Sequence, residues 1–313
     1  METELYKIRN VAACIKASYD LFSTNIAKLL KRTWLPILVM SILLAVMQAV
    51  FTSFGARENP QVLTPSILLT FSLVGIVIGL ALIAVSVWLD TTIVGLLNGK
   101  SFKTNFPRVT RLALVNIGIV VLAVIVIKLL VSLPFIMAKG APTANDIAIS
   151  YGLVLAFMVI VAISTLPLGY GYMKYVIEPN TKLHTVFGRS YCDGWRYWGY
   201  LFVLTLLAGI LLGLLYFVVM MPSAVIEFST TLDRQGIAMG DQSGMPSHIG
   251  LLSFVTTMIC AAIWSFMAIW LMMVYYYAYG HIEAKITAKK HNKTSLFEVK
   301  GVESEGQKQG NAN

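Results

Sequence analysis

Charged side chains are scarce in this sequence, and their scarcity identifies its broad class. Asp, Glu, Lys and Arg make up 12% of the 313 residues, whereas they make up about 25% of an ordinary soluble domain. Hydrophobic residues make up 57% of the chain, and its mean hydropathy is +0.75. These values exclude an ordinary soluble globular domain and indicate a protein that lies in a lipid bilayer.

The residues that usually carry catalysis or bind metals are also few. The sequence contains no Walker A motif and no GxSxG nucleophile elbow. Its four histidines form no HExxH or other close metal-binding spacing; they are His184, His248, His281 and His291. We therefore expect no enzyme activity, no metal site and no cofactor.

Six apolar runs are each long enough to cross about 30 Å of hydrocarbon as a helix that rises about 1.5 Å per residue. Each run is continuously apolar and lacks the alternation of a barrel strand. The sequence therefore predicts an all-α polytopic membrane protein. The predicted transmembrane helices are residues 34–54, 66–89, 112–138, 151–176, 198–226 and 249–279. Residues 1–33 precede them, and a polar tail, 280–313, follows them and is expected to be partly disordered.

The positive charges are divided unevenly between the segments outside these spans. Twenty of the 24 Lys and Arg residues lie in the N-terminal segment, the connections 97–111 and 174–196, and the tail. The other three connections hold one each, and Lys128 lies within a span. Because positive charge is retained in the cytoplasm, we predict that both termini are cytoplasmic. Charges spread over four membrane-bound segments suit a nucleic acid poorly, so we expect no nucleic-acid partner.

Two further inferences depend on this topology. Cys14 and Cys192 fall on the cytoplasmic side and Cys260 within a span, so we expect no disulfide. Asp90 and Lys128 are ionisable residues inside spans, where such groups are costly. Because they approach opposite membrane borders, we expect them to meet the headgroup layer and not to pair with each other.

An amphipathic helix is predicted before the first span, because apolar residues recur there at spacings of three and four. The apolar stripe comprises Leu5, Ile8, Ala12, Ile15, Tyr19, Phe22, Ile26 and Leu29. A break in this helix is expected near Ser18. We favour a position in the cytoplasmic membrane interface. Packing across the cytoplasmic ends of the spans and a coiled-coil seam are the alternatives.

Related sequences precede the first, third and fifth spans: FSTNIAKLLKR, FKTNFPRVTR and FGRSYCDGWR. Each begins with Phe and carries a cation nine residues later, namely Lys31, Arg111 and Arg196. The pattern predicts three successive hairpins, each preceded by a cytoplasmic interfacial helix. Chance similarity between basic membrane borders is the alternative. The three cations are our candidate contacts for anionic lipid headgroups.

The connection from Pro167 to Tyr200 is rich in aromatic and basic residues and reads PLGYGYMKYVIEPNTKLHTVFGRSYCDGWRYWGY. Tyr and Trp favour the headgroup layer, where the ring stays apolar and its polar atom meets water. We therefore expect this connection to cross the cytoplasmic interface. The connection 227–248 on the other side contains several turn-forming residues and is expected to be irregular.

Two pairs of glycines within spans have the spacing that allows close helix approach, namely Gly75 with Gly79 and Gly209 with Gly213. Small residues four apart let two helix backbones come together in a membrane. We expect these pairs to form contacts within the helix bundle.

The overall layout resembles a broad group of uncharacterised six-span bacterial membrane proteins. The resemblance rests on the basic amphipathic lead-in, on PLGYGY at the end of the fourth span and on GRSYCDGWRYWGY at the start of the fifth. The membrane domain attached to some glycerophosphodiester phosphodiesterases is similar to that group. This chain has no segment long and polar enough to be their soluble catalytic domain. The resemblance therefore implies an architecture in a bacterial inner membrane and transfers no catalytic residues.

These observations favour a binding function over a catalytic one. We predict a non-catalytic integral membrane protein that binds anionic lipids, or a membrane or cytoplasmic protein partner, at the cytoplasmic face of the inner membrane. The alternative is a permease or a membrane subunit of a transport complex, which the six spans would also fit. No span has a Gly or Pro interruption at its centre, and this counts against a substrate pathway.

Overall fold

The structure is a computed structural model that describes residues 4–55, 65–137, 143–240, 244–246 and 248–310. Helices dominate these ranges, and no strand occurs within them. The predicted all-α class is therefore confirmed.

Six of the helices are long and apolar enough to cross a membrane. They are α2 (Ile26–Gly55), α3 (Pro65–Asn98), α4 (Phe102–Met137), α5 (Ala144–Ile177), α8 (Trp198–Ala238) and α9 (Ile249–Gly310). Each overlaps one of the predicted spans, so the protein is a multi-pass membrane protein. The shorter helices are α1 (Val11–Thr24), α6 (Leu183–Phe187) and α7 (Arg189–Arg196).

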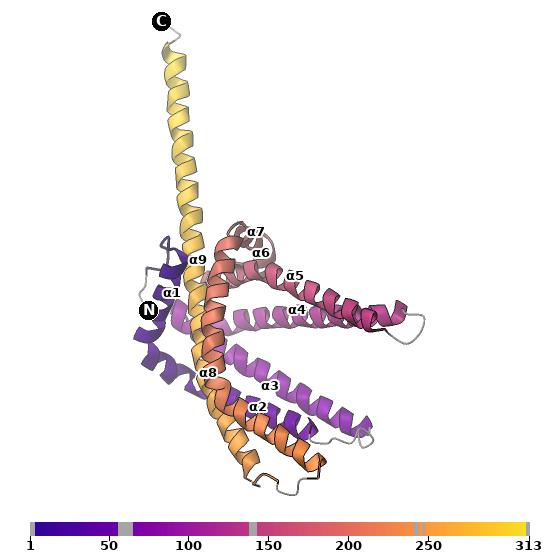
Figure 1. Cartoon of the computed structure of the whole chain (residues 1–313). Helices are drawn as coiled ribbons and strands as arrows, with labels where there is room; N and C mark the ends of the chain where they lie inside the picture. Colours follow the sequence, from indigo (N-terminus) through magenta and orange to yellow (C-terminus); the bar gives the residue numbers. More distant parts are fainter. Residues whose placement is uncertain (1–3, 56–64, 138–142, 241–243, 247, 311–313) are drawn as a thin grey trace.

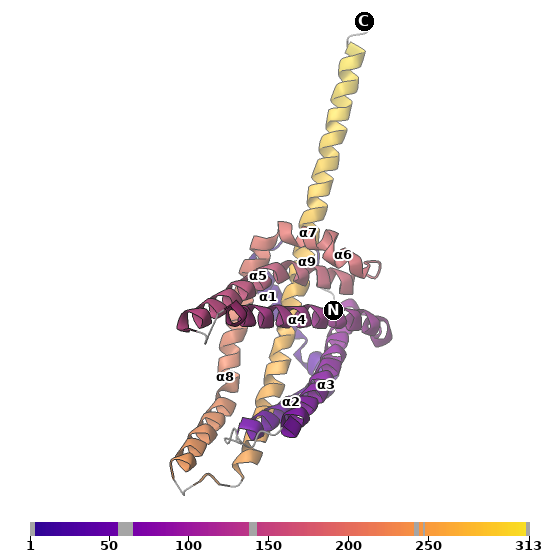
Figure 2. The same ribbon diagram turned by 90° about the vertical axis from the view of Figure 1, so that its right-hand side faces the viewer.

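The long helices pair as three hairpins that fan out from a common region (Figure 1). Helix α2 pairs with α3, α4 with α5, and α8 with α9. Helix α9 also packs along α2, which joins the first hairpin to the third. Figure 2 shows the same three hairpins from the side, with α9 continuing well past the region where they meet. The predicted division into three hairpins is confirmed.

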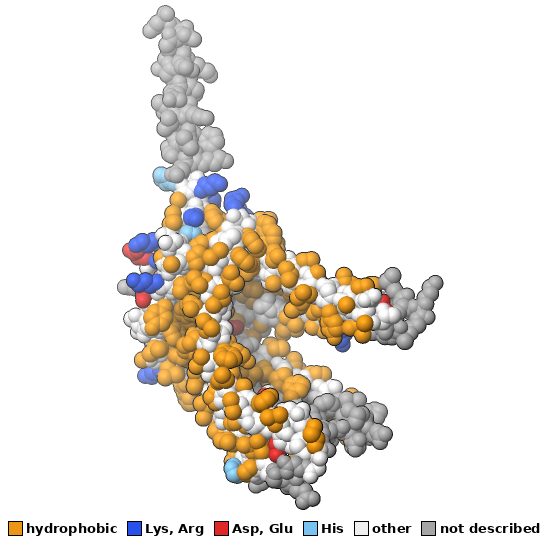
Figure 3. Space-filling model, in the orientation of Figure 1, with side chains coloured by type: hydrophobic (Ala, Val, Ile, Leu, Met, Phe, Trp, Pro, Cys, Tyr) orange, Lys and Arg blue, Asp and Glu red, His pale blue; other side chains and the backbone are white. Residues whose placement is uncertain are grey.

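We call the region where the hairpins meet the hub; it consists of residues 5–34, 89–112, 167–204 and 269–286. The largest fully buried side chains of the described ranges all lie there, including Tyr170, Leu201, Met273 and Tyr279. Outside the hub the helices expose apolar side chains, which cover much of the three hairpins in Figure 3. Lipid chains solvate such faces, so these helices need no protein cover to be stable in a bilayer.

Local sequence explains how the chain enters and turns in the hub. The side chain of Asn10 caps α1 by accepting the N–H of Ala13 at 2.8 Å. Between α3 and α4, Gly99 has φ +69°, a conformation that favours glycine. The amides of Asn98 and Asn105 bond to each other across this turn at 2.9 and 3.1 Å. The turn is therefore held by its own side chains.

The N-terminal helix differs from its prediction in its bounds. Helix α1 begins only at Val11, and the break before α2 comes at Asn25. The predicted break near Ser18 is wrong, because the Ser18 hydroxyl donates to the Cys14 carbonyl oxygen at 2.7 Å and stays within a regular helix. The Asn25 side chain instead bonds back to the Leu21 carbonyl oxygen at 2.9 Å, which suits a helix end.

The buried face of α1 also differs from the predicted stripe. Cys14 and Ser18 are fully buried, and the Ser18 hydroxyl lies 3.4 Å from the Met273 carbonyl oxygen of α9. Tyr19, which belongs to the predicted stripe, is 61% exposed. Small side chains let α1 approach α9, so contact with α9 determined which face is buried. Helix α1 therefore packs across the spans, which was one of the alternatives to the favoured interfacial position.

Two helices extend beyond the predicted spans. Helix α8 continues to Ala238, through half of the connection 227–248, and ends just before Gly240 with φ +98°. The expectation of an irregular connection is therefore wrong for this half. Helix α9 continues to Gly310, beyond residue 279 where the last predicted span ends, and the partial disorder expected for the tail stays a prediction. No proline occurs after Pro246 to interrupt this helix.

The two glycine pairs do not form the contacts predicted for them. A Cβ added at any of the four would meet nothing within 4 Å; they are Gly75, Gly79, Gly209 and Gly213. Close approach occurs instead in the hub, where a Cβ at Gly194 of α7 would lie 2.8 Å from the Pro167 carbonyl oxygen of α5. The splayed hairpins therefore meet through hub residues and not through the glycine pairs.

Candidate functional site

Lys174 on α5 is held between two carboxylates at the hub. Its Nζ lies 2.5 Å from Oε1 of Glu283 on α9 and 4.0 Å from Oε1 of Glu178 at the end of α5. The Tyr170 hydroxyl donates to the same Glu283 oxygen at 2.5 Å. Tyr170 is fully buried, and the Lys174 and Glu283 side chains are only 21% and 15% exposed. This ion pair and its phenol donor connect α5 to α9.

Spacing along α5 brings its three polar residues to one face. Tyr170, Lys174 and Glu178 are four residues apart, so their side chains lie above one another. A glycine allows α9 to approach this part of α5, because a Cβ at Gly169 would lie 2.5 Å from the ring of Tyr275. The sequence PLGYGYMKYVIE therefore combines a close helix contact with a polar face.

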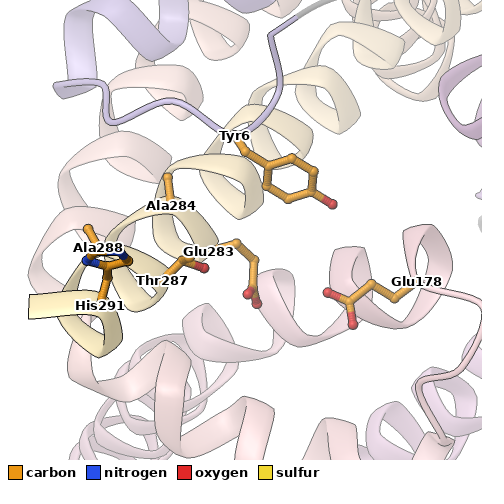
Figure 4. A pocket seen from close by; sticks show the side chains of 7 residues that line it. All are labelled: Tyr6, Glu178, Glu283, Ala284, Thr287, Ala288 and His291. Carbon is orange, nitrogen blue, oxygen red and sulfur yellow. The ribbon is translucent and has the colours of Figure 1, made fainter. Parts of the chain in front are cut away.

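Glu178 and Glu283, the two carboxylates beside Lys174, line a pocket of about 670 Å³. Its lining residues are Tyr6, Glu178, Glu283, Ala284, Thr287, Ala288 and His291. In Figure 4 the carboxylates of Glu178 and Glu283 point toward each other, with the Tyr6 ring beside them. The Tyr279 hydroxyl donates to Glu178 at 2.8 Å and lies 3.2 Å from the Tyr6 hydroxyl. The pocket thus presents carboxylate, hydroxyl and imidazole groups.

Arg108 of α4 closes the C-terminal end of α5. Its guanidinium donates to the carbonyl oxygens of Pro179 at 2.6 Å, Glu178 at 2.9 Å, Thr181 at 3.1 Å and Tyr175. It also lies 4.3 Å from the centroid of the Tyr175 ring. The last carbonyls of a helix lack partners within it, and a cation there complements the helix dipole. Arg108 therefore has a structural role.

The three cations predicted to contact lipid are all exposed. Lys31 lies on α2, Arg111 on α4 and Arg196 at the end of α7. Within the part of the chain that the structure describes, none of them forms a hydrogen bond or an ion pair, and no contact joins one to another. The structure therefore leaves these side chains available but does not gather them into one pocket.

The aromatic residues of the segment 167–200, which includes the end of α5 and the start of α8, divide between the core and the surface. Tyr170 and Tyr175 are buried, so the headgroup position predicted for this connection is wrong for these two. Trp195 is 48% exposed and remains available to an interface. The difference arises because one face of α5 packs against α9 and α4, which aromatic content alone does not reveal.

Two expectations from the sequence concern metal binding and the charged residues within the spans. Among the described residues, no group of three or more His, Cys, Asp or Glu side chains could hold a metal ion. Asp90 on α3 is partly buried, whereas Lys128 on α4 is exposed, and the two form no ion pair with each other.

Sequence analysis missed the contribution of α9 to the hub. Tyr279, His281 and Glu283 were treated only as the border between the last span and the tail. The signal was present in YYYAYGHIE, residues 275–283, where ionisable groups interrupt an aromatic run. Polar groups in a buried stretch require partners, so this run indicates a packed polar cluster.

Comparisons with known proteins do not assign this chain to a family, so its class is defined by its fold. No family model, curated protein or solved structure matches this chain. Its six long apolar helices define an all-helical, multi-pass membrane protein.

Proposed function

We propose that this protein is non-catalytic and binds anionic lipid headgroups at the cytoplasmic face of a bacterial inner membrane. The observation that carries the proposal is a division among the cations of the hub region. Arg108 and Lys174 are engaged in contacts within the chain. Lys31, Arg111 and Arg196 are exposed and have no such contacts in the described ranges. The second group is free to meet external anions.

The expected strength of this binding follows from the number of cations. A Lys or Arg near an anionic membrane surface contributes about 1 kcal/mol. The three together would contribute about 3 kcal/mol, or about a hundredfold preference for anionic over neutral lipid. Trp34 and Trp195 are 55% and 48% exposed and are neighbours of Lys31 and Arg196 in sequence. Indole rings favour the headgroup layer, so they support this placement.

The test compares the wild type with the joint Lys31→Gln, Arg111→Gln and Arg196→Gln variant. Both are placed in nanodiscs of phosphatidylglycerol and phosphatidylethanolamine, and native mass spectrometry counts the retained lipids. We expect the wild type to retain more phosphatidylglycerol than its share of the bilayer and the variant to lose this excess.

The matched control is Lys128→Gln. Lys128 is exposed on α4, as Arg111 is, but belongs to the other end of that helix. We expect this variant to retain lipid as the wild type does. A correctly inserted triple variant with unchanged phosphatidylglycerol retention would contradict the proposal.

The second candidate is a permease or a membrane subunit of a transport complex, and the α4–α5 hairpin favours it. Beyond the hub this hairpin extends away from α8 and α9 (Figure 1), and the most apolar stretch of α4 has no buried residue. A second membrane protein would cover this surface as well as lipid does.

Single cysteines along α3, α5 and α9 test the transport function with a water-soluble maleimide. Labelling at mid-depth would favour transport, and unlabelled helices would favour the lipid-binding proposal.

A further inference from the structure

The segment before α1 crosses α9 as a short strap, which we define as residues 4–9. Leu5 is buried against α9, and its carbonyl oxygen occupies the space that a Cβ on Gly280 would need. The Arg9 backbone N–H donates to Nδ1 of His281 at 2.8 Å. The Tyr6 hydroxyl lies 3.2 Å from that of Tyr279. The strap is therefore attached to α9 by one close backbone contact and two polar contacts.

The strap is also folded on itself. The Lys7 N–H donates to the Leu5 carbonyl oxygen at 3.0 Å. The Arg9 guanidinium donates to that oxygen at 3.1 Å and to the Glu4 carbonyl oxygen. The same guanidinium makes a further contact with α9, because it lies 4.9 Å from the centroid of the Tyr277 ring. The strap can thus leave or join α9 as a preformed loop, because much of its order comes from its own contacts.

His281 occupies a buried position with an uneven set of neighbours. It is 1% exposed, and its ring stacks on Tyr200 of α8 with centroids 4.2 Å apart. The charged groups that face it are Arg9 on the strap and Lys285 on α9. From α1, the titratable thiol of Cys14 interacts with Tyr200. Two cations thus lie near an imidazole that accepts a hydrogen bond.

The contact with the strap depends on the protonation state of this imidazole. Nδ1 can accept the Arg9 N–H only while it carries no proton, and Nε2 is buried without a hydrogen-bond partner. A proton added at Nδ1 would replace the acceptor with a donor that faces another donor. It would also add a positive charge beside Arg9 and Lys285. Both effects favour separation of the strap from α9.

We propose that His281 is a proton-sensitive latch that holds the strap closed against the edge of the pocket at Glu178 and Glu283. The closed strap requires an imidazole without a proton on Nδ1, so it is stable at higher pH and is released as the pH falls. Tyr6 forms part of the pocket lining, and its hydroxyl lies beside that of Tyr279, so release of the strap widens the pocket and leaves the Tyr279 hydroxyl in contact with Glu178 alone. This regulation goes beyond lipid binding by Lys31, Arg111 and Arg196 and does not depend on it.

Hydrogen exchange of the full-length protein in nanodiscs tests the latch at about pH 8 and about pH 5, which span histidine titration. The measured quantity is the protection of the Arg9 amide, whose N–H donates to His281, after correction for intrinsic exchange. We expect the wild type to lose protection about tenfold or more on acidification. Peptides from 167–176 in the buried part of α5 should keep their protection at both pH values.

Two variants distinguish release of the strap by protonation of His281 from a general loosening of the hub. His281→Asn keeps an acceptor oxygen near the Nδ1 position but does not titrate, so its strap should stay protected at both pH values. Gly280→Ala removes the space for the Leu5 carbonyl oxygen, so its strap should be unprotected at both. The proposal is overturned if wild-type protection does not change with pH, if His281→Asn shows the wild-type pH dependence, or if residues 167–176 open together with the strap.

Discussion

Lys174 of α5 and Glu283 of α9 form an ion pair at 2.5 Å, although 109 residues separate them in the chain. Both side chains are largely buried, with 21% and 15% exposed. Two hairpins that otherwise fan apart are therefore joined by a charged contact, and removal of one partner leaves the other charge without its main counterion.

Glu283→Gln should lower the free energy of unfolding by about 1 to 3 kcal/mol, because Lys174 and the Tyr170 hydroxyl lose a charged acceptor. Thermal unfolding in detergent, followed by circular dichroism, measures the change. Glu4→Gln is the matched control, because Glu4 pairs with Lys7 at an exposed site where the side chains are 77% and 63% exposed. We expect no measurable loss there. A double-mutant cycle of Lys174→Met with Glu283→Leu that gave no coupling would contradict a stabilising pair.

Arg108→Gln and Arg111→Gln should have opposite effects, although both residues lie on α4. Arg108→Gln removes charged hydrogen bonds to the end of α5 and should lower the free energy of unfolding by about 2 to 3 kcal/mol. Arg108→Lys should rescue little of it, because an ammonium group lacks the guanidinium fork. Arg111→Gln should change stability by less than about 0.5 kcal/mol but should reduce phosphatidylglycerol retention. Melting curves and native mass spectra of each variant measure both quantities, and the reverse pattern would show that the roles are misassigned.

Gly194→Ala should destabilise the protein and Gly199→Ala should not. The new methyl group at residue 194 would lie 2.8 Å from the Pro167 carbonyl oxygen, whereas one at residue 199 would meet nothing within 4 Å. Overpacking of this kind costs about 1 to 3 kcal/mol. Equal melting temperatures for the two variants would show that α7 can move away from α5 without cost.

Cys192 should react from the cytoplasmic side with a membrane-impermeant maleimide. It is the exposed cysteine of the chain, whereas Cys14 and Cys260 are buried. Burial raises the pKa of the Cys14 thiol, which further slows its alkylation. We expect labelling in inverted membrane vesicles, no labelling in sealed right-side-out vesicles, and none in Cys192→Ser. Labelling only in right-side-out vesicles would reverse the predicted orientation and place the proposed lipid contacts on the other face.

The class of the protein and its number of crossings could be predicted from the sequence. Continuous apolar runs such as 198–226 are properties of one segment, and each overlaps a long helix of the structure. The exposure of Lys31, Arg111 and Arg196 follows from their places at the polar borders of such runs. Helix ends were less accurate, because α8 continues to Ala238 through Ser and Thr side chains that bond to the preceding turn.

The contacts of the hub were determined only by the tertiary structure. Periodicity marked Tyr19 as part of an apolar stripe, but contact with α9 buried Cys14 and Ser18 instead. The partners of Lys174 and His281 come from segments far along the chain, so no local pattern could assign them. Hydropathy measures the affinity of a segment for the bilayer. This affinity is a sum over the residues of that segment, so the sequence alone predicts it. The contact partner of a buried side chain depends on which helix faces meet, and only the three-dimensional arrangement of the helices determines those faces.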